Sequence, residues 1–174
     1  MAQALAVLFD RDGTIIVDVP GNADPLRVTP MPHAHSALQR LRRANIPTAV
    51  VSNQGGVASG HLTSEQVRAV NARAEELLGP LGPIFICEHG ESFECDCRKP
   101  QPGLVLLAAA ALGVRPADCV VVGDIGADMG AALAAGARGI LVPTPRTRSE
   151  EISDAPAVAT HLDEAVDAIL AGDI

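Results

Sequence analysis

The fold of this chain is decided by residues 4–14, which read ALAVLFDRDGT. Ala4–Phe9 is an apolar run of strand length, and the carboxylates of Asp10 and Asp12 follow it directly. A strand that is apolar at every position is typical of a parallel sheet with both faces covered. We therefore predict a buried strand that delivers two carboxylates to the edge of a sheet, the alternative being a solvated acidic turn.

Further apolar runs alternate with helical patterns along the rest of the chain. Strands are predicted at Thr48–Ser52, Ile84–Cys87, Cys119–Gly123 and Gly139–Val142. Helices are predicted at about His33–Ala44, Ser64–Leu78, Gly103–Leu112, Ala127–Ala135 and Asp163–Ala171, and Glu150-Glu151 is interpreted as a solvated face. The alternation favours an α/β fold with a doubly wound parallel sheet and helices on both faces. With 174 residues and no visible repeat or linker, residues 1–174 are expected to form one domain.

Composition restricts the class of protein. The formal net charge of −8 argues against a general affinity for nucleic acid or anionic membranes, and a small anionic substrate would need local cations. No run reaches the length of a membrane helix, and Ala4–Phe9 lacks the basic leader of a signal peptide. Three of the four cysteines, Cys87, Cys95 and Cys97, lie close together in one segment and are candidates to bind a metal. Because such cysteines stay reduced in the cytoplasm, we expect a cytoplasmic protein, with a monomer as the default.

Two carboxylates that leave one strand tip can divide a phosphoryl transfer between them. Asp10 can attack phosphorus and form an aspartyl-phosphate, which splits one difficult displacement into two easier ones. Asp12 can then protonate the leaving alkoxide and later deprotonate the attacking water. In a parallel sheet the ligand site lies at the carboxyl ends of the strands, so other strand ends are expected to complete this site.

Other polar clusters fall at or near those strand ends. After the second strand, Ser52 with Asn53, Gln54 and main-chain amides could hold phosphate oxygens, although an ordinary turn has the same composition. Lys99 could neutralise the transferring phosphate, and the forked donors of Arg98 could reach a second anionic group.

The strand Cys119–Gly123 delivers a further acidic cluster. Asp124 follows it directly, and Asp128 lies four positions later, at the start of the next predicted helix. Magnesium favours a few carboxylates together with substrate oxygens and water, so Asp124 is a candidate ligand. Asp128 could bind the metal, brace Lys99 or merely favour the start of the helix.

Four soft metal ligands lie within eleven positions: Cys87, His89, Cys95 and Cys97. Zinc takes such ligands in a closed tetrahedron when its role is structural. The alternatives are buried thiols or thiols awaiting a disulfide, but Cys95 and Cys97 are too close to bridge each other comfortably. A zinc loop at about 87–97 would fix the position of the adjoining Lys99.

In order and spacing these clusters resemble the four motifs of the haloacid dehalogenase superfamily of phosphatases. The matching segments are Asp10-x-Asp12-Gly13-Thr14, Ser52, Lys99 and Gly123-Asp124-x3-Asp128. The resemblance implies a Rossmann-like fold, with Asp10 as nucleophile, Asp12 as acid and base, and Ser52 and Lys99 as phosphoryl stabilisers. It also implies a magnesium ion held by Asp10, Asp124 and the main-chain carbonyl of Asp12. Too few residues separate the motifs to make a large cap domain.

The Cys-x-His-x5-Cys-x-Cys-Arg-Lys-Pro run is similar to the zinc-bearing subgroup of heptose 1,7-bisphosphate phosphatases and histidinol phosphatases. The short spacer resembles the histidinol phosphatases. Ser52–Gly60 and its continuation Thr63–Asn71 resemble the heptose enzymes, which implies hydrolysis of the 7-phosphate of heptose 1,7-bisphosphate. Relatives place substrate contacts in Asp18–Pro32, where Asp18 and Gly21 are candidates, whereas Ile125 replaces a commonly basic residue. A histidinol-phosphate phosphatase, another phosphate monoesterase, a phosphotransferase and a sugar-phosphate binding module remain alternatives.

Overall fold

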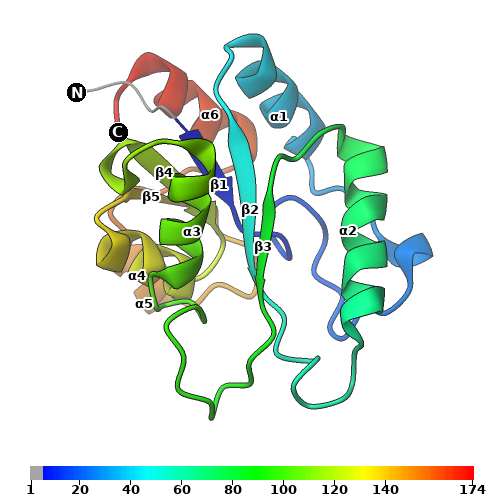
Figure 1. Cartoon of the computed structure of the whole chain (residues 1–174). Coiled ribbons are helices and arrows are strands. Elements are labelled where there is room, and N and C mark those ends of the chain that lie inside the picture. The colour runs from blue at the N-terminus through cyan, green and yellow to red at the C-terminus, as the bar shows by residue number, and fades with distance from the viewer. Residues whose placement is uncertain (1–5) are drawn as a thin grey trace.

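Five parallel strands form one sheet in the order β3-β2-β1-β4-β5 (Figure 1). The computed structural model describes residues 6–174, so Ala4 and Leu5 of the first predicted strand lie outside the described residues. The strands are β1 (Ala6–Phe9), β2 (Thr48–Asn53), β3 (Ile84–Cys87), β4 (Cys119–Gly123) and β5 (Arg138–Leu141). Phe9 is in register with Val50 of β2 and Val122 of β4, so the carboxyl ends of these three strands meet at one edge.

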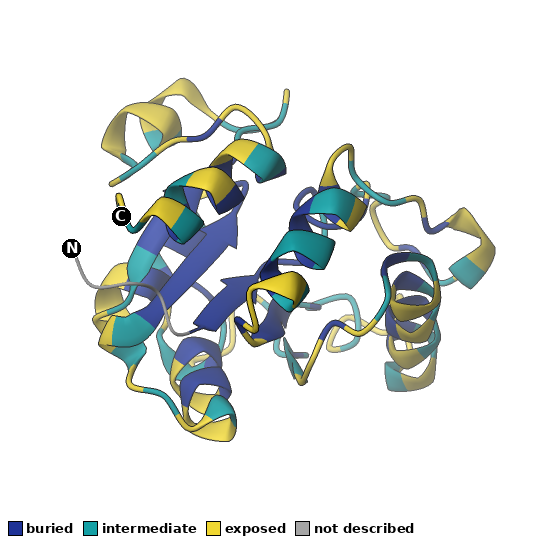
Figure 2. Cartoon of the chain, turned by 90° about the horizontal axis from the view of Figure 1, so that it is seen from above, coloured by how far each residue is buried: buried dark blue, intermediate teal, exposed yellow. Residues whose placement is uncertain are grey.

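Helices cover both faces of the sheet (Figure 2). They are α1 (Ala34–Arg43), α2 (Ser64–Leu78), α3 (Gly103–Leu112), α4 (Gly126–Ala135), α5 (Ser149–Asp154) and α6 (Leu162–Ala171), with 3-10 turns at Pro25–Arg27 and Pro116–Asp118. Val7 and Phe9 pack into a core with α1, α2 and α6, whereas Ala6 and Leu8 pack into a second core with α3 and α4. Each large aliphatic side chain so buried stabilises the fold by about 1.5–3 kcal/mol. The predicted doubly wound parallel sheet is confirmed.

Hydrogen bonds to side chains fix the starts of α2 and α4. α2 begins at a capping box, in which Thr63 Oγ1 accepts from the Gln66 amide at 3.1 Å and Gln66 Oε1 accepts from the Thr63 amide at 2.9 Å. The interpretation of Glu150-Glu151 as a solvated face was wrong for Glu151. That residue lies in α5, and its carboxylate accepts the amides of Gly126 at 3.0 Å and Arg148 at 2.9 Å, which ties α5 to the start of α4.

A short excursion separates β1 from α1. Val17 donates to the Thr29 carbonyl at 2.8 Å and Met31 donates to the Ile15 carbonyl at 3.0 Å, so the excursion leaves and returns as a paired stem. Its 3-10 turn, Pro25–Arg27, packs against α2. Within residues 6–174 no inserted domain caps the sheet edge, as the sequence predicts. No helix in this range combines the length and apolar character needed to cross a membrane.

Candidate active site

The edge of the sheet where β1, β2 and β4 end carries the predicted polar clusters. Asp10 follows β1, Ser52 lies near the end of β2, and Asp124 follows β4; all three are at most 7% exposed. The connections after β2 and β3 lie on this same side, at the foot of Figure 1. The structure therefore brings together three strand ends that are 42 or more positions apart in the chain.

Lys99 lies at the centre of this cluster. Its Nζ donates to Asp10 Oδ1 at 2.6 Å, to Asp128 Oδ1 at 2.6 Å and to the Val51 carbonyl at 2.9 Å, which uses all three ammonium protons. Burial alone would lower the pKa of Lys99, but the Asp10 and Asp128 carboxylates outweigh it and hold the pKa above its usual value. Lys99 is therefore a fixed positive charge.

Asp128 braces that charge. Its side chain is fully buried, and while Oδ1 accepts from Lys99, Oδ2 accepts the main-chain amides of Asp124 and Ile125, each at 3.2 Å. Of the interpretations that the sequence left open for Asp128, bracing Lys99 and closing the first turn of α4 are both seen in the structure. Asp128 also lies close enough to Asp10 and Asp124 to share a cation with them.

The cluster holds more negative charge than Lys99 can neutralise. Burial raises the pKa of Asp10 well above its usual value, Lys99 opposes the rise, and Asp128 and Asp12 add to it. Burial and the charge of Asp128 raise the pKa of Asp124 to about 7. The oxygens of Asp10, Asp124 and Asp128 lie within 4.8 Å of one another. Hard oxygen donors with uncompensated charge fit magnesium.

Two glycines allow these carboxylates to approach the main chain. A Cβ on Gly13 would lie 2.3 Å from Asp124 Oδ2, and Gly13 also has a positive φ of 80°. A Cβ on Gly123 would lie 2.2 Å from the carboxyl carbon of Asp128. Any side chain at either position would displace a carboxylate of the cluster, so both glycines are needed for the observed geometry.

Asp12 is held from two sides. Arg11 donates to it through Nη2 at 2.8 Å and Nε at 3.2 Å, and Gln54 Nε2 donates to Asp12 Oδ2 at 2.7 Å. Gln54 Nε2 also lies 2.9 Å from Ser52 Oγ, which links the ends of β1 and β2. Arg11 extends further and donates to Asn71 Oδ1 of α2 at 2.8 Å. Neither Arg11 nor Asn71 was assigned from the sequence, although Asn71 interrupts the buried apolar stripe of α2.

Two of the remaining predicted substrate contacts, Asn53 and Asp18, have protein partners here. Asn53 donates from Nδ2 to the Lys99 carbonyl and accepts the Lys99 amide at Oδ1, each at 3.0 Å, so it fixes the backbone of Lys99. Asp18 forms an ion pair with Arg146, a residue that the sequence did not single out. Gly21 is exposed in the excursion with a φ of 63°. Their contact with substrate stays a prediction.

The predicted zinc ligands converge at and just after the end of β3, and together they form the sulfur cluster: Cys87, His89, Cys95 and Cys97. Cys97 Sγ lies 3.1 Å from Cys87 Sγ, 3.6 Å from Cys95 Sγ and 3.3 Å from His89 Nδ1. Ligands about 2.0–2.3 Å from a tetrahedral zinc are separated by about 3.3–3.8 Å, so the cluster fits that ion. Burial and the neighbouring Cys87 and Cys95 sulfurs raise the pKa of the Cys97 thiol to about 12.

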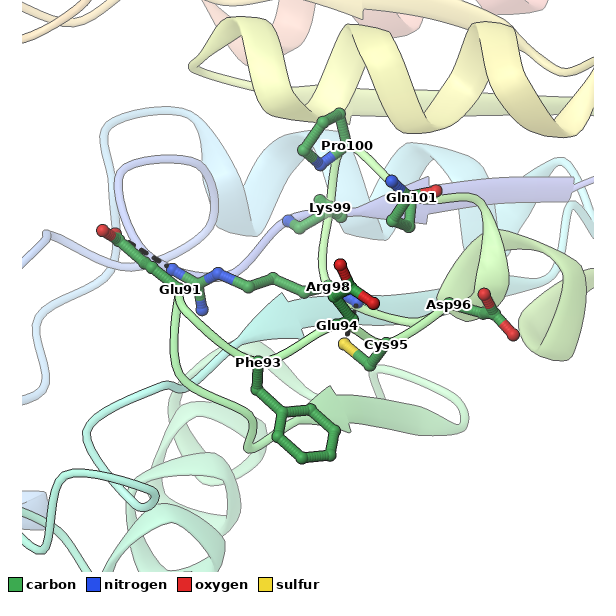
Figure 3. Close-up of a pocket in the computed structure, with 9 residues that line it drawn as sticks. All are labelled: Glu91, Phe93, Glu94, Cys95, Asp96, Arg98, Lys99, Pro100 and Gln101. Atoms are coloured by element: carbon green, nitrogen blue, oxygen red, sulfur yellow. Dashed lines mark hydrogen bonds and ion pairs between the residues drawn. The ribbon is translucent and has the colours of Figure 1, made fainter.

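The sulfur cluster orients Arg98. The Arg98 amide lies 3.4 Å from Cys95 Sγ, and its guanidinium donates to the His89 carbonyl and to Glu91, each at 3.2 Å. Figure 3 shows Arg98 reaching across to Glu91 along a cavity of about 720 Å³. Lys99 forms part of the cavity wall, but none of the carboxylates of the cluster does. The cavity therefore lies beside the carboxylates, on the side of the sulfur cluster.

Known proteins are similar to this chain in sequence. A family model described as "HAD-hyrolase-like" matches residues 96–168. The D-glycero-beta-D-manno-heptose-1,7-bisphosphate 7-phosphatase of Pseudomonas putida is 36% identical over 143 residues, which cover 79% of this chain and 82% of that protein. The enzyme of the same name from Pseudomonas aeruginosa is 36% identical over 149 residues, 83% of each chain. The chain belongs to the HAD-like hydrolase family.

Solved structures of HAD-like hydrolases agree with this assignment. The D,D-heptose 1,7-bisphosphate phosphatase of B. bronchiseptica, complexed with magnesium and phosphate, superposes with a TM-score of 0.83 at 27% identity. The match covers 96% of this chain and 99% of that one. A HAD-like phosphatase from Mesorhizobium loti superposes with a TM-score of 0.75 at 32% identity, over 96% of this chain and 88% of that one. The predicted superfamily and fold are thus confirmed.

Proposed function

We propose that this HAD-like hydrolase is a magnesium-dependent phosphatase that removes the 7-phosphate of D-glycero-beta-D-manno-heptose 1,7-bisphosphate. One observation supports the chemistry above all: Lys99 bridges Asp10 and Asp128 inside a cluster that also holds Asp124. The names of the similar enzymes from two Pseudomonas species support the substrate. The family, the cluster and these names favour the same reaction.

The reaction has two displacements. A carboxylate oxygen of Asp10 attacks phosphorus, the bond to the sugar oxygen breaks, and Asp12 gives its proton to the departing alkoxide. Asp12 then takes a proton from a water, whose oxygen attacks phosphorus and breaks the aspartyl-phosphate bond. Inorganic phosphate leaves and the Asp10 carboxylate is restored. Ser52 and Lys99 stabilise the charge on the phosphoryl oxygens throughout.

Magnesium would be held by Asp10, Asp124 and the main-chain carbonyl of Asp12, and would supply positive charge to the phosphoryl oxygens when bound. The role of Asp128 at the metal is indirect, because its two oxygens already accept from Lys99 and from two main-chain amides. Zinc would be held by Cys87, His89, Cys95 and Cys97 and would fix the chain that carries Arg98 and Lys99.

The second phosphate of the substrate needs cations at the rim. Arg98 extends over the segment after β2, where its Nη1 would lie 3.0 Å from a Cβ on Gly55. Arg146 lies on the segment after β5, next to Thr147, whose hydroxyl donates to the Asp124 carbonyl at 2.6 Å. Each guanidinium is paired with a carboxylate that solvent can reach, Glu91 or Asp18, so a phosphate can replace that partner. Arg146 would thus supply the charge that Ile125 lacks.

The test is phosphate release from both anomers of heptose 1,7-bisphosphate, from histidinol phosphate and from simple sugar phosphates, with and without magnesium. Asp10→Asn, purified in parallel, excludes contaminating phosphatases. We expect the highest kcat/KM for the beta bisphosphate. Equal and slow turnover of every compound would contradict the assignment of heptose 1,7-bisphosphate as the substrate but would still support a phosphatase.

A histidinol-phosphate phosphatase is the second candidate, favoured by the five residues between His89 and Cys95. The same panel distinguishes it by the highest kcat/KM on histidinol phosphate. A sugar-phosphate binding module would bind the bisphosphate without releasing phosphate, and a phosphotransferase would need a sugar acceptor. We also propose a cytoplasmic monomer, which sedimentation and cell fractionation would test.

A further inference from the structure

Arg11 is a buried charge that the reaction above does not use. Arg11 is 3% exposed, and its guanidinium donates hydrogen bonds to two different side chains. Nη1 donates to Asn71 Oδ1 at 2.8 Å, while Nε and Nη2 donate to the Asp12 carboxylate. Asn71 is itself 6% exposed and lies in the middle of α2, sixty positions along the chain from Arg11.

In this geometry Asn71 fixes the Arg11 guanidinium, and the guanidinium in turn fixes the Asp12 carboxylate. The guanidinium is planar, so fixing one arm fixes the direction in which the other arm presents its donors. Asn71 belongs to α2, whose apolar face is packed into the core under the sheet. Asp12, in contrast, has a side chain that is 27% exposed and stands at the open edge, where it could rotate. Gln54 also restrains the Asp12 carboxylate, and its side chain is hydrogen-bonded to Ser52 near the end of β2.

We propose that Asn71, acting through Arg11, positions the carboxyl group of Asp12 for proton transfer to the leaving group. Asn71 and Arg11 are positioning residues, because the first reaches the reaction only through the second. The inference rests on the proposed acid and base role of Asp12. A purely structural role for the same contacts would be to fasten the turn after β1 to α2, and the two roles predict different kinetics.

The decisive quantity is how kcat/KM depends on the leaving group. This constant reports the steps up to departure of the leaving group, and p-nitrophenol departs without needing a proton. Asn71→Leu removes the acceptor while keeping similar volume. We expect it to lower kcat/KM about tenfold or more for phenyl phosphate and for the sugar bisphosphate, and less than about twofold for p-nitrophenyl phosphate.

Two variants serve as controls. Val67→Ala removes a buried side chain from α2 without removing a hydrogen-bond partner of Arg11, so it should lower stability and leave the leaving-group dependence unchanged. Asn71→Asp keeps an acceptor oxygen and should restore most of the lost kcat/KM. If Asn71→Leu does not fold, Arg11→Lys carries the test, because a lysine cannot present a rigid fork to both partners.

The Asp12→Asn background separates this inference from the proposed function. If Asp12 is the acid, Asp12→Asn alone lowers turnover of phenyl phosphate far more than that of p-nitrophenyl phosphate, and adding Asn71→Leu lowers it no further. An equal loss on all substrates in Asn71→Leu would overturn the positioning role, as would a full additional loss in the double variant. If Asp12→Asn shows no such dependence, the acid role itself fails and takes the inference with it.

Discussion

The carboxylate cluster around Lys99 and the sulfur cluster of residues 87–97 lie side by side, yet the chain holds them in different ways. The carboxylates come from the ends of neighbouring strands, whose register is fixed by two hydrophobic cores. The sulfur ligands lie on a segment whose only strand residue is Cys87. The first cluster is therefore arranged by the fold, whereas we expect the second to depend on the zinc ion proposed for it. Lys99 connects the two clusters, because it follows the sulfur ligands in sequence and its ammonium group lies among the carboxylates.

The largest effect should come from Asp10→Asn. Loss of the nucleophile is expected to lower kcat by about 10³-fold or more, measured as phosphate release. Because the sheet positions this residue, the far-ultraviolet circular dichroism spectrum should not change. A loss of helical signal would show that the carboxylate cluster supports the fold as well as being arranged by it.

Cys97→Ala should have the next largest effect and should act on the other cluster. We expect loss of one bound zinc by metal analysis and a decrease of about 2–4 kcal/mol in the free energy of unfolding. Hydrogen exchange should increase in residues 88–98 and stay slow in β1 and β4. Cys119→Ala is the matched control, because Cys119 is a buried thiol of β4 outside the cluster. Native protein without zinc would contradict the assignment.

Asn53→Ala tests the connection between the two clusters. It removes both hydrogen bonds to the main chain of Lys99 while leaving every metal ligand in place. Displacement of Lys99 should lower kcat about 10- to 100-fold, with zinc content unchanged. An unchanged kcat would show that Asn53 is not needed to position Lys99.

The smallest change in stability is expected at Asp163, which belongs to neither cluster and pairs α6 with α1. Burial opposes the shift, but the His33 and Ser36 side chains lower the pKa of this carboxyl. A lowered pKa means that the stabilisation is present above the unfolded pKa, about 3.9, and is lost as the pH falls through the lower folded value. Asp163→Asn should cost about 0.2–1 kcal/mol at neutral pH in denaturant unfolding, with kcat unchanged. A loss of activity would mean that packing of α1 on α6 controls the site.

Local patterns account for what the sequence predicted. Apolar runs gave the strands, and the acidic residues that follow the first and fourth strands gave the carboxylate cluster. These signals need only a few neighbouring residues. The pairs that stayed hidden join distant ones: Arg11 with Asn71 across 60 positions and Asp18 with Arg146 across 128. Asn53 was predicted to contact substrate, and no local pattern could reveal that its amide is bound to the backbone 46 positions away.

The saturation of Lys99 has a consequence for turnover. All three of its protons already have acceptors, so a phosphoryl oxygen can bind Lys99 only by taking the place of one of them. The free energy of phosphate binding is then the difference between two sets of hydrogen bonds, which is smaller than either set. Lys99 therefore contributes less to the binding of inorganic phosphate than an unpaired lysine would, which favours release of the product.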